Sequence, residues 1–164
     1  MSANGRTDIF LVTGPQTKIV KKCNVAASST IIYPGDPVTR AAGDVAVVLL
    51  ATGAPAVATD FVEGIAESVS TNTAAKAGTV DVIQNIPGQI WAIKPNDTTA
   101  WDTQAEYDAL VGKRVLIDLT STTYTILADD QTVNGCVIEA KNVKTSNPGW
   151  VYFTFRHSTR PNQL

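Results

Sequence analysis

Short apolar runs alternate with turn-forming residues along most of the chain. The runs VAVVLL (45–50), FVEGIAES (61–68), TVDVIQ (79–84) and QIWAIK (89–94) each have the length of a β-strand. The links between them consist largely of Gly, Ala, Thr, Asn and Pro, which favour turns, whereas Val, Ile and Thr suit a pleated, half-buried surface. The middle of the chain is therefore predicted to form a compact antiparallel β unit.

The alternation continues on both sides of this unit. On the N-terminal side, IFLV (9–12) and TKIVKKCNV (17–25) are strand-like, and an extended piece, STIIY (29–33), leads into a tight corner at PGDP (34–37). On the C-terminal side, four further strands are predicted, at RVLIDL (114–119), TYTIL (123–127), CVIEAKNVK (136–144) and WVYFTF (150–155).

The last of these predicted strands carries large side chains on both faces. Val151, Phe153 and Phe155 share one face, while Trp150 and Tyr152 lie on the other. Such a strand is either central in its sheet or covered by a neighbouring subunit. We therefore assign Trp150 and Tyr152 to an oligomer interface as a hypothesis.

One segment has the signature of a helix. Thr103 and Glu106 have capping-box spacing, the residues between and after them favour helix, and Gly112 can end it. With about ten strands and this single helix, the predicted fold is all-β, mainly an antiparallel small barrel or sandwich, with one short α-helix near residues 102–111.

Three parts are expected along the chain. Residues 1–17 form an extended N-terminal arm, residues 18–157 form the β-barrel or sandwich domain, and residues 158–164 form a C-terminal tail.

Composition and charge limit the partners. The chain has 164 residues, enough for one domain with its own core, and only 17% of them are charged. The net charge of −2 lacks the excess of Lys and Arg that neutralises phosphates, so nucleic acid is not an expected partner. The most apolar stretch, 45–58, is too short to span a membrane. Because the start lacks the apolar core of a signal peptide, we expect the chain to be made in a reducing cytoplasm.

Residues that catalyse reactions or bind metals do not form a recognisable set. Cys23 and Cys136 are expected to be buried free thiols, since no Cys or His occurs at zinc spacing. The single histidine, His157, has no GxSxG motif to supply a serine partner. Two carboxylate pairs lack the spacing of a calcium loop and are interpreted as turn residues: Asp97 with Asp102, and Asp129 with Asp130. We therefore expect no enzymatic activity, no cofactor and no metal.

Four segments resemble the small β-rich decoration, or cement, proteins of tailed bacteriophage capsids: YPGDPVTRAAGDVAVV, FVEGIAESVSTNTAAKAGTVDVIQNIPGQIWAIK, ALVGKRVLIDL and WVYFTFR. The resemblance covers about residues 30–156 and rests on a Gly-Asp-x-Val entry, a Gly-Ile-Ala strand, an Ala/Thr/Gly-rich hairpin and a helix closed by Gly-Lys. It implies a homotrimer, or a set of copies, seated outside an icosahedral shell and bridging neighbouring subunits of the major capsid protein. The implied location is the capsid exterior of the virion.

The residues that would bind such a shell are inferred from the chain itself. Ile9, Phe10, Leu11 and Val12 are apolar and follow a polar head, so as an extended arm they can add a strand to the edge of a partner. The alternative is that they form the first strand of their own sheet, and both alternatives stay open.

The one basic cluster lies on the next predicted strand. Lys18, Lys21 and Lys22 form either a solvated face or a docking site for an acidic protein surface. On the second interpretation, Lys18 and Lys21 join the candidates for capsid binding.

Two other functions are compatible with the same sequence. A carbohydrate-binding or adhesion module would use Trp91, Trp101 and Trp150 as a flat platform for sugar rings, whereas core or interface packing would bury them. A tail or connector protein of a virion would assemble as a ring instead of a trimer.

Overall fold

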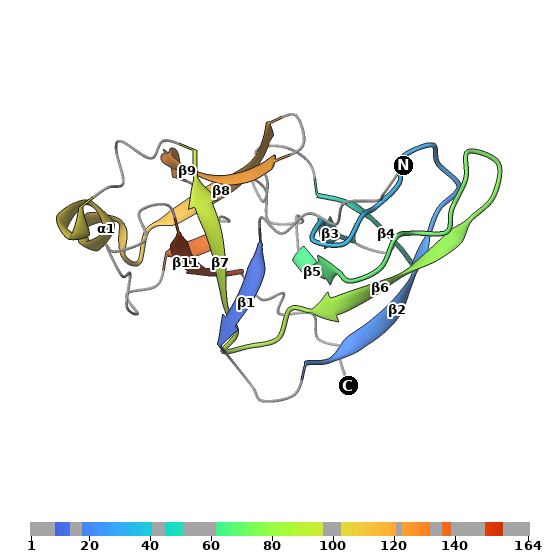
Figure 1. Cartoon of the computed structure of the whole chain (residues 1–164), viewed down its shortest axis with the longest axis horizontal. Helices are drawn as coiled ribbons and strands as arrows, with labels where there is room; N and C mark the ends of the chain where they lie inside the picture. Colours follow the sequence, from blue (N-terminus) through green and yellow to red (C-terminus); the bar gives the residue numbers. More distant parts are fainter. Residues whose placement is uncertain are drawn as a thin grey trace.

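The computed structural model of the chain describes residues 9–13, 18–40, 45–50, 62–96, 103–120, 123–131, 136–138 and 150–155. Over these residues the chain forms eleven strands and one short helix, which confirms the predicted all-β class with a single helix. The strands divide into a closed barrel and a second, larger sheet. In Figure 1 the barrel strands gather on one side of the molecule, and the larger sheet lies on the other side with the helix at its far end.

The barrel is built from the N-terminal half of the chain. Its order is β2-β4-β3-β5-β6, and only the pairing of β2 with β4 is parallel. Inward-facing residues of these strands form a small core of mainly β-branched side chains. The strands are β2 (Val20–Val25), β3 (Pro37–Thr39), β4 (Ala46–Leu49), β5 (Val62–Ala66) and β6 (Gly78–Gln84). The core residues are Cys23, Val25, Ile32, Val38, Val47, Ala66, Val80 and Val82.

The larger sheet combines the first strand with the C-terminal half of the chain. Its order is β1-β7-β11-β10-β8-β9, and β9 also pairs in parallel with β7, so the sheet curls back on itself. The strands are β1 (Phe10–Thr13), β7 (Ile90–Pro95), β8 (Arg114–Thr120), β9 (Thr123–Gln131), β10 (Cys136–Ile138) and β11 (Val151–Thr154).

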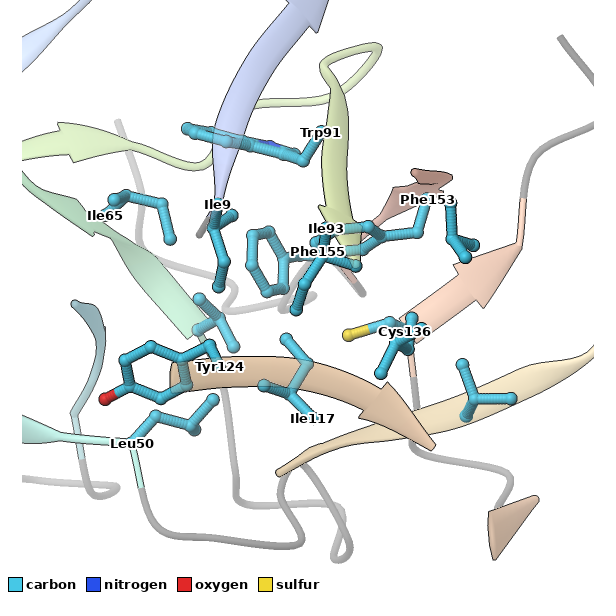
Figure 2. Packing of buried hydrophobic residues seen from close by; sticks show 14 of the residues in the cluster. Ile9, Leu50, Ile65, Trp91, Ile93, Ile117, Tyr124, Cys136, Phe153 and Phe155 are labelled. Carbon is cyan, nitrogen blue, oxygen red and sulfur yellow. The ribbon is translucent and has the colours of Figure 1, made fainter. Parts of the chain in front are cut away.

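A second, aromatic core lies inside the larger sheet. It contains Trp91, Tyr107, Tyr124, Phe153 and Phe155, and it also takes in apolar side chains from the barrel side of the molecule. Figure 2 shows Ile9 among Trp91, Ile65 and Phe155 in this core. The barrel and the sheet are therefore joined by one continuous apolar contact. The barrel residues that take part are Leu50, Val62 and Ile65.

Helix α1 (Gln104–Leu110) begins as its sequence predicts. Thr103 accepts a hydrogen bond from the backbone N–H of Glu106, and the Glu106 side chain accepts one from the backbone of Thr103, which completes a capping box. Gly112 follows the helix with a φ of 78°, in the left-handed region that glycine adopts without strain. Tyr107 is the buried residue of the helix and docks it onto the core of the larger sheet.

The PGDP corner is more than a turn. Gly35, with a φ of 92°, donates its backbone N–H to Ala66 O at 2.8 Å, and Ala66 N donates to Asp36 O at 2.8 Å. Asp36 is fully buried, and its Oδ2 accepts from the backbone N–H of Tyr33 at 2.8 Å. These bonds carry the chain from the predicted corner directly into β3, a strand that the sequence pattern did not predict. Pro37 is tolerated because it is the first residue of its strand.

Two predicted strands have different lengths in the structure. β9 runs through residues 128–131, which we expected to be a link, because Gln131 pairs with Val115 after a register shift in β8. The strand expected over residues 136–144 is β10 over its first three residues, and residues 139–144 lie outside the described ranges. β11 lies between β7 and β10, so of the two predicted alternatives, a central strand or one covered by a subunit, the structure shows a central strand.

The N-terminal apolar run belongs to its own sheet. Phe10 pairs with Ala92 and Leu11 with Trp91, and Ile9 is only 4% exposed. Of the two alternatives for residues 9–12, an arm that pairs with a partner and the first strand of the chain's own sheet, the structure shows the second. The expected arm over residues 1–17 is not detached at residues 9–13, because burial of Ile9 holds them against the core.

Candidate interaction surface

The outer face of the larger sheet carries an aromatic patch, which we define as Phe10, Lys94, Trp150 and Tyr152. Phe10 and Tyr152 both pair with Ala92, from β1 and β11 on either side of β7. The rings of Phe10 and Trp150 meet edge to face, with centroids 4.7 Å apart and an interplanar angle of 71°. Lys94 Nζ lies 5.4 Å from the centroid of the Trp150 ring, within range of a cation–π contact.

This patch remains partly open to solvent. Phe10 is 43% exposed, and Val12, two residues further along β1, is 39% exposed. Trp150 and Tyr152 are half-buried. An edge-to-face aromatic pair is worth about 0.5–1.5 kcal/mol beyond its buried area, so the pair holds these rings in fixed positions. Partly exposed, clustered aromatic rings are typical of surfaces that bind another protein.

The structure brings together residues that the sequence assigned to separate roles. Phe10, a candidate for capsid binding, contacts Trp150 from the hypothetical oligomer interface. Ile9 faces the core and Leu11 packs against it, so neither contributes much to an outer surface. Sequence reasoning missed this contact because Phe10 and Trp150 lie near opposite ends of the chain. Lys94 was also missed, and the only signal for it is its exposed position within the buried strand β7.

The two lysines of the capsid-binding hypothesis are not members of this patch. Lys18 forms an exposed ion pair with Glu67, next to β5. Lys21 is exposed on β2 of the barrel. An exposed pair of this kind contributes little to stability, so Lys18 and Glu67 chiefly set the local charge.

A groove lies between β1 and the barrel, and we call it the β1 groove. Its volume is about 410 Å³, and apart from Glu67 it is lined by apolar residues and glycine. It therefore offers a second concave surface beside the first strand. The lining residues are Ile9, Phe10 and Leu11 on one side, Pro34, Gly35, Ile65, Ala66, Glu67 and Ile83 on the other, and Trp91 from β7.

One polar atom at this groove lacks a partner. Trp91 is 1% exposed, and no residue within the described ranges accepts a hydrogen bond from its Nε1. A buried indole N–H without an acceptor costs about 1–3 kcal/mol, and such groups are rare in folded proteins.

The barrel contains a polar cluster around Arg40. Its guanidinium lies 3.3 Å from Glu63 Oε1, donates to Val45 O at 2.8 Å and lies 3.8 Å from Cys23 Sγ. Burial raises the pKa of the Cys23 thiol, and the charge of Arg40 opposes that shift only in part. The thiol is therefore protonated at neutral pH and is a poor nucleophile.

Both cysteines are free and buried, as predicted. Cys136 lies in the core of the larger sheet, where burial raises its pKa even more than that of Cys23. Because the two thiols belong to different cores, a disulfide between them would require the fold to change.

The described residues contain no group of three or more His, Cys, Asp and Glu side chains that can hold a metal ion. Asp97, Asp102, Trp101 and His157 lie outside those ranges, as do the side chains of Asp129 and Asp130. The absence of catalysis and of cofactors therefore stays a prediction. In the part of the chain that the structure describes, no helix has the length and apolarity needed to cross a membrane.

Comparisons with protein-family models, with curated proteins and with solved structures find no match to this chain, so its function is argued from the surfaces described above.

Proposed function

We propose that this chain is a decoration protein of a tailed bacteriophage head, which binds the outside of the assembled shell and bridges neighbouring subunits of the major capsid protein. The observation that carries the proposal is the aromatic patch on the outer face of the larger sheet. In this proposal the protein acts as a homotrimer, and the patch is buried between its copies. Val12, Lys18 and Lys21 stay exposed for contact with the shell.

Two of the motifs behind the resemblance support the proposal because they contact each other. The PGD corner hydrogen-bonds to Ala66 of the Gly-Ile-Ala strand through Gly35 and Asp36. Position 64 of the same strand requires glycine because the backbone of Ile83 lies directly against it. A Cβ built there would overlap the carbonyl oxygen of Ile83 and lie 2.8 Å from its carbonyl carbon. These residues therefore specify a rigid scaffold and leave recognition to the surface.

The mechanism is thermodynamic linkage. A protein that binds only the assembled shell stabilises it by RT ln(1 + [L]/Kd), which is about 3 kcal/mol per site at a hundredfold excess over Kd. Three linked binding sites raise the avidity by about 10² to 10⁴ over one site, provided that the geometry allows them to bind together. Weak contacts repeated over the shell therefore suffice to resist internal pressure.

The first test measures the oligomeric state. Light scattering after size exclusion should give a trimer for the native chain and a monomer for Tyr152→Lys, because the new charge cannot be buried between copies. Val45→Lys is the matched control, since Val45 is 77% exposed on the barrel, and it should remain trimeric. A native monomer, or a trimer that Tyr152→Lys leaves intact, would contradict the assigned interface.

The second test measures binding to the shell. Cosedimentation with shells assembled from the major capsid protein of the same phage should retain the native chain and raise the temperature at which the shells disrupt. A chain that neither sediments with the shells nor stabilises them would remove the proposed function.

The carbohydrate-binding alternative loses one of its expected platform residues. Trp91 is 1% exposed and belongs to the core, while Trp150 is met edge-on by Phe10 at 71° instead of lying in a common plane. Retention on a glycan array, abolished by Trp150→Ala, would favour that function over decoration. A ring stoichiometry in the scattering experiment would favour a tail or connector protein.

A further inference from the structure

One side of β1 has no hydrogen-bonded neighbour among the described strands. Every other described strand has at least two hydrogen-bonded neighbours, whereas β1 pairs only with β7. A strand with an unpaired side presents a row of backbone N–H and C=O groups that can template another strand. β1 is therefore the single position among the described strands where the sheet can be extended.

The β1 groove runs along this open side. It is lined by the consecutive residues Ile9, Phe10 and Leu11. Phe10 and Leu11 are neighbours in β1 and point to opposite faces, so a groove that contacts both follows the edge of the strand instead of one face. Figure 1 shows β1 between β7 and the barrel strands β5 and β6, which supply the far side of the groove.

One of the residues that line the groove carries a buried donor without an acceptor. Trp91 lines it from β7, and the Trp91 Nε1–H has no hydrogen-bond acceptor among the described residues. An extended polypeptide can supply both an acceptor for the Trp91 Nε1–H and a second neighbour for β1. Its backbone carbonyls accept hydrogen bonds, and its backbone edge can pair with a strand.

The charges of the groove narrow the choice of occupant. Among the described residues, Glu67 is the only ionisable one that lines the groove, and it is already paired with Lys18. The remaining lining residues are apolar or glycine, so a charged segment would lose its hydration without gaining a partner. The groove suits an uncharged segment with apolar side chains at alternate positions.

We propose that the β1 groove binds an extended, apolar segment of a partner polypeptide, which adds to the open side of β1 as a further strand and accepts a hydrogen bond from Trp91 Nε1 through a backbone carbonyl. Because β1 has four residues, the bound segment needs about as many. A volume of about 410 Å³ falls in the range of about 300–1,000 Å³ that is usual for ligand sites.

The test uses the full chain labelled with ¹⁵N at its indole nitrogens and a soluble probe, acetyl-Lys-Thr-Val-Thr-Val-Thr-Lys-amide. The indole signals are assigned with Trp→Phe variants at each of the three tryptophans. Titration with the probe should move the Trp91 indole signal downfield, as expected for a newly formed hydrogen bond. It should also protect backbone amides of β1 from hydrogen exchange.

Two controls make the result specific. A probe with Pro in place of the central Thr lacks the N–H needed for strand pairing and should bind at least tenfold more weakly. Trp91→Phe retains an aromatic ring but has no donor, and it should weaken probe binding about three- to tenfold. Glu67→Gln should leave binding of the probe within about twofold, because the site itself is apolar.

If none of the three indole signals moves in millimolar probe, or if the proline probe moves them equally, the proposal is overturned even if no variant folds. The inference does not rest on shell binding, because the probe is titrated into the chain without capsids, but Phe10 belongs both to the groove and to the proposed trimer interface. Loss of shell binding with retained probe binding would remove decoration alone, and the reverse result would remove the strand-binding groove alone.

Discussion

The barrel and the larger sheet use opposite means to reach a stable core. The barrel core consists of β-branched and small side chains, and its strands close on themselves. The larger sheet contains the bulky rings, among them Trp91, Phe153 and Phe155, and it leaves one strand open. A barrel with a narrow interior is filled by small residues, whereas a broader sheet needs large ones.

The barrel and the larger sheet also differ in where their polar residues lie. The barrel region includes buried Asp36 and the close pair of Arg40 with Glu63. On the outer face of the larger sheet, Lys94 lies over the Trp150 ring. The barrel is therefore expected to depend on backbone fit and hydrogen bonds, and the sheet on the volume of its side chains.

The largest expected effect comes from emptying the sheet core. Phe153→Ala removes a fully buried ring that packs 4.9 Å from Phe155, centroid to centroid, and should lower the free energy of unfolding by about 3–5 kcal/mol. Urea denaturation monitored by circular dichroism measures the loss. Phe10→Ala is the matched control with the same chemical change at an exposed site, and it should cost clearly less. Equal losses would break the distinction between core and patch.

A smaller but still large effect is expected from a single methyl group in the barrel. Gly64→Ala places a Cβ against the backbone of Ile83, which cannot move without disturbing β6, so we expect a loss of about 3 kcal/mol. Gly112→Ala is the control. No atom lies within 4 Å of its Cβ, and its cost, about 1 kcal/mol, comes from the positive φ alone. The two midpoints in urea should therefore be well separated, and overlapping midpoints would show that β5 and β6 can move apart.

The buried carboxylate of the PGDP corner should have a moderate effect. Asp36→Ala leaves the backbone N–H of Tyr33 without its acceptor at 2.8 Å, so the free energy of unfolding should fall by about 2 kcal/mol. Asp36→Asn keeps an oxygen at this position and should lose less. Differential scanning calorimetry can rank the three proteins, and the ranking fails if the Ala and Asn variants melt together.

The smallest expected difference concerns the two thiols. Burial raises the pKa of both Cys23 and Cys136, so neither should react with a thiol reagent in the folded protein at pH 8. In mild denaturant both should react at the same rate, because Leu50, Val62 and Ile65 tie the barrel to the core of the larger sheet. Mass spectrometry of Cys→Ala variants at each position separates the two rates. Much faster labelling of Cys23 would show that the barrel opens alone.

Local patterns were sufficient to predict most elements. The capping box of Thr103 and Glu106 defined the start of α1, and the alternation in residues 150–155 predicted a strand with two heavy faces, for which a central position was one of two alternatives. β3 was missed because Pro37 marks a corner in the sequence, and its role as the first residue of a strand depends on pairing with β5.

The division into a barrel and a sheet had no local signal. It depends on pairings between distant segments, such as Phe10 with Ala92, which no periodicity reveals. The aromatic patch is similar: exposed apolar residues in β1 and the two heavy faces of β11 each suggested a surface, but only the fold shows that Phe10 and Trp150 meet. The lack of an acceptor for Trp91 Nε1–H could not be predicted either, because it depends on which groups surround the buried ring in the fold.

The pairing of Phe10 with Ala92 also sets the order of events during synthesis. At about 5–20 residues per second, the ribosome adds Ala92 on the order of 10 s after Phe10. During that delay the strands of the barrel are being synthesised, and the nascent chain carries an apolar segment that has no strand to pair with. We therefore expect chaperones that recognise short apolar stretches to hold this segment on the ribosome until β7 is available.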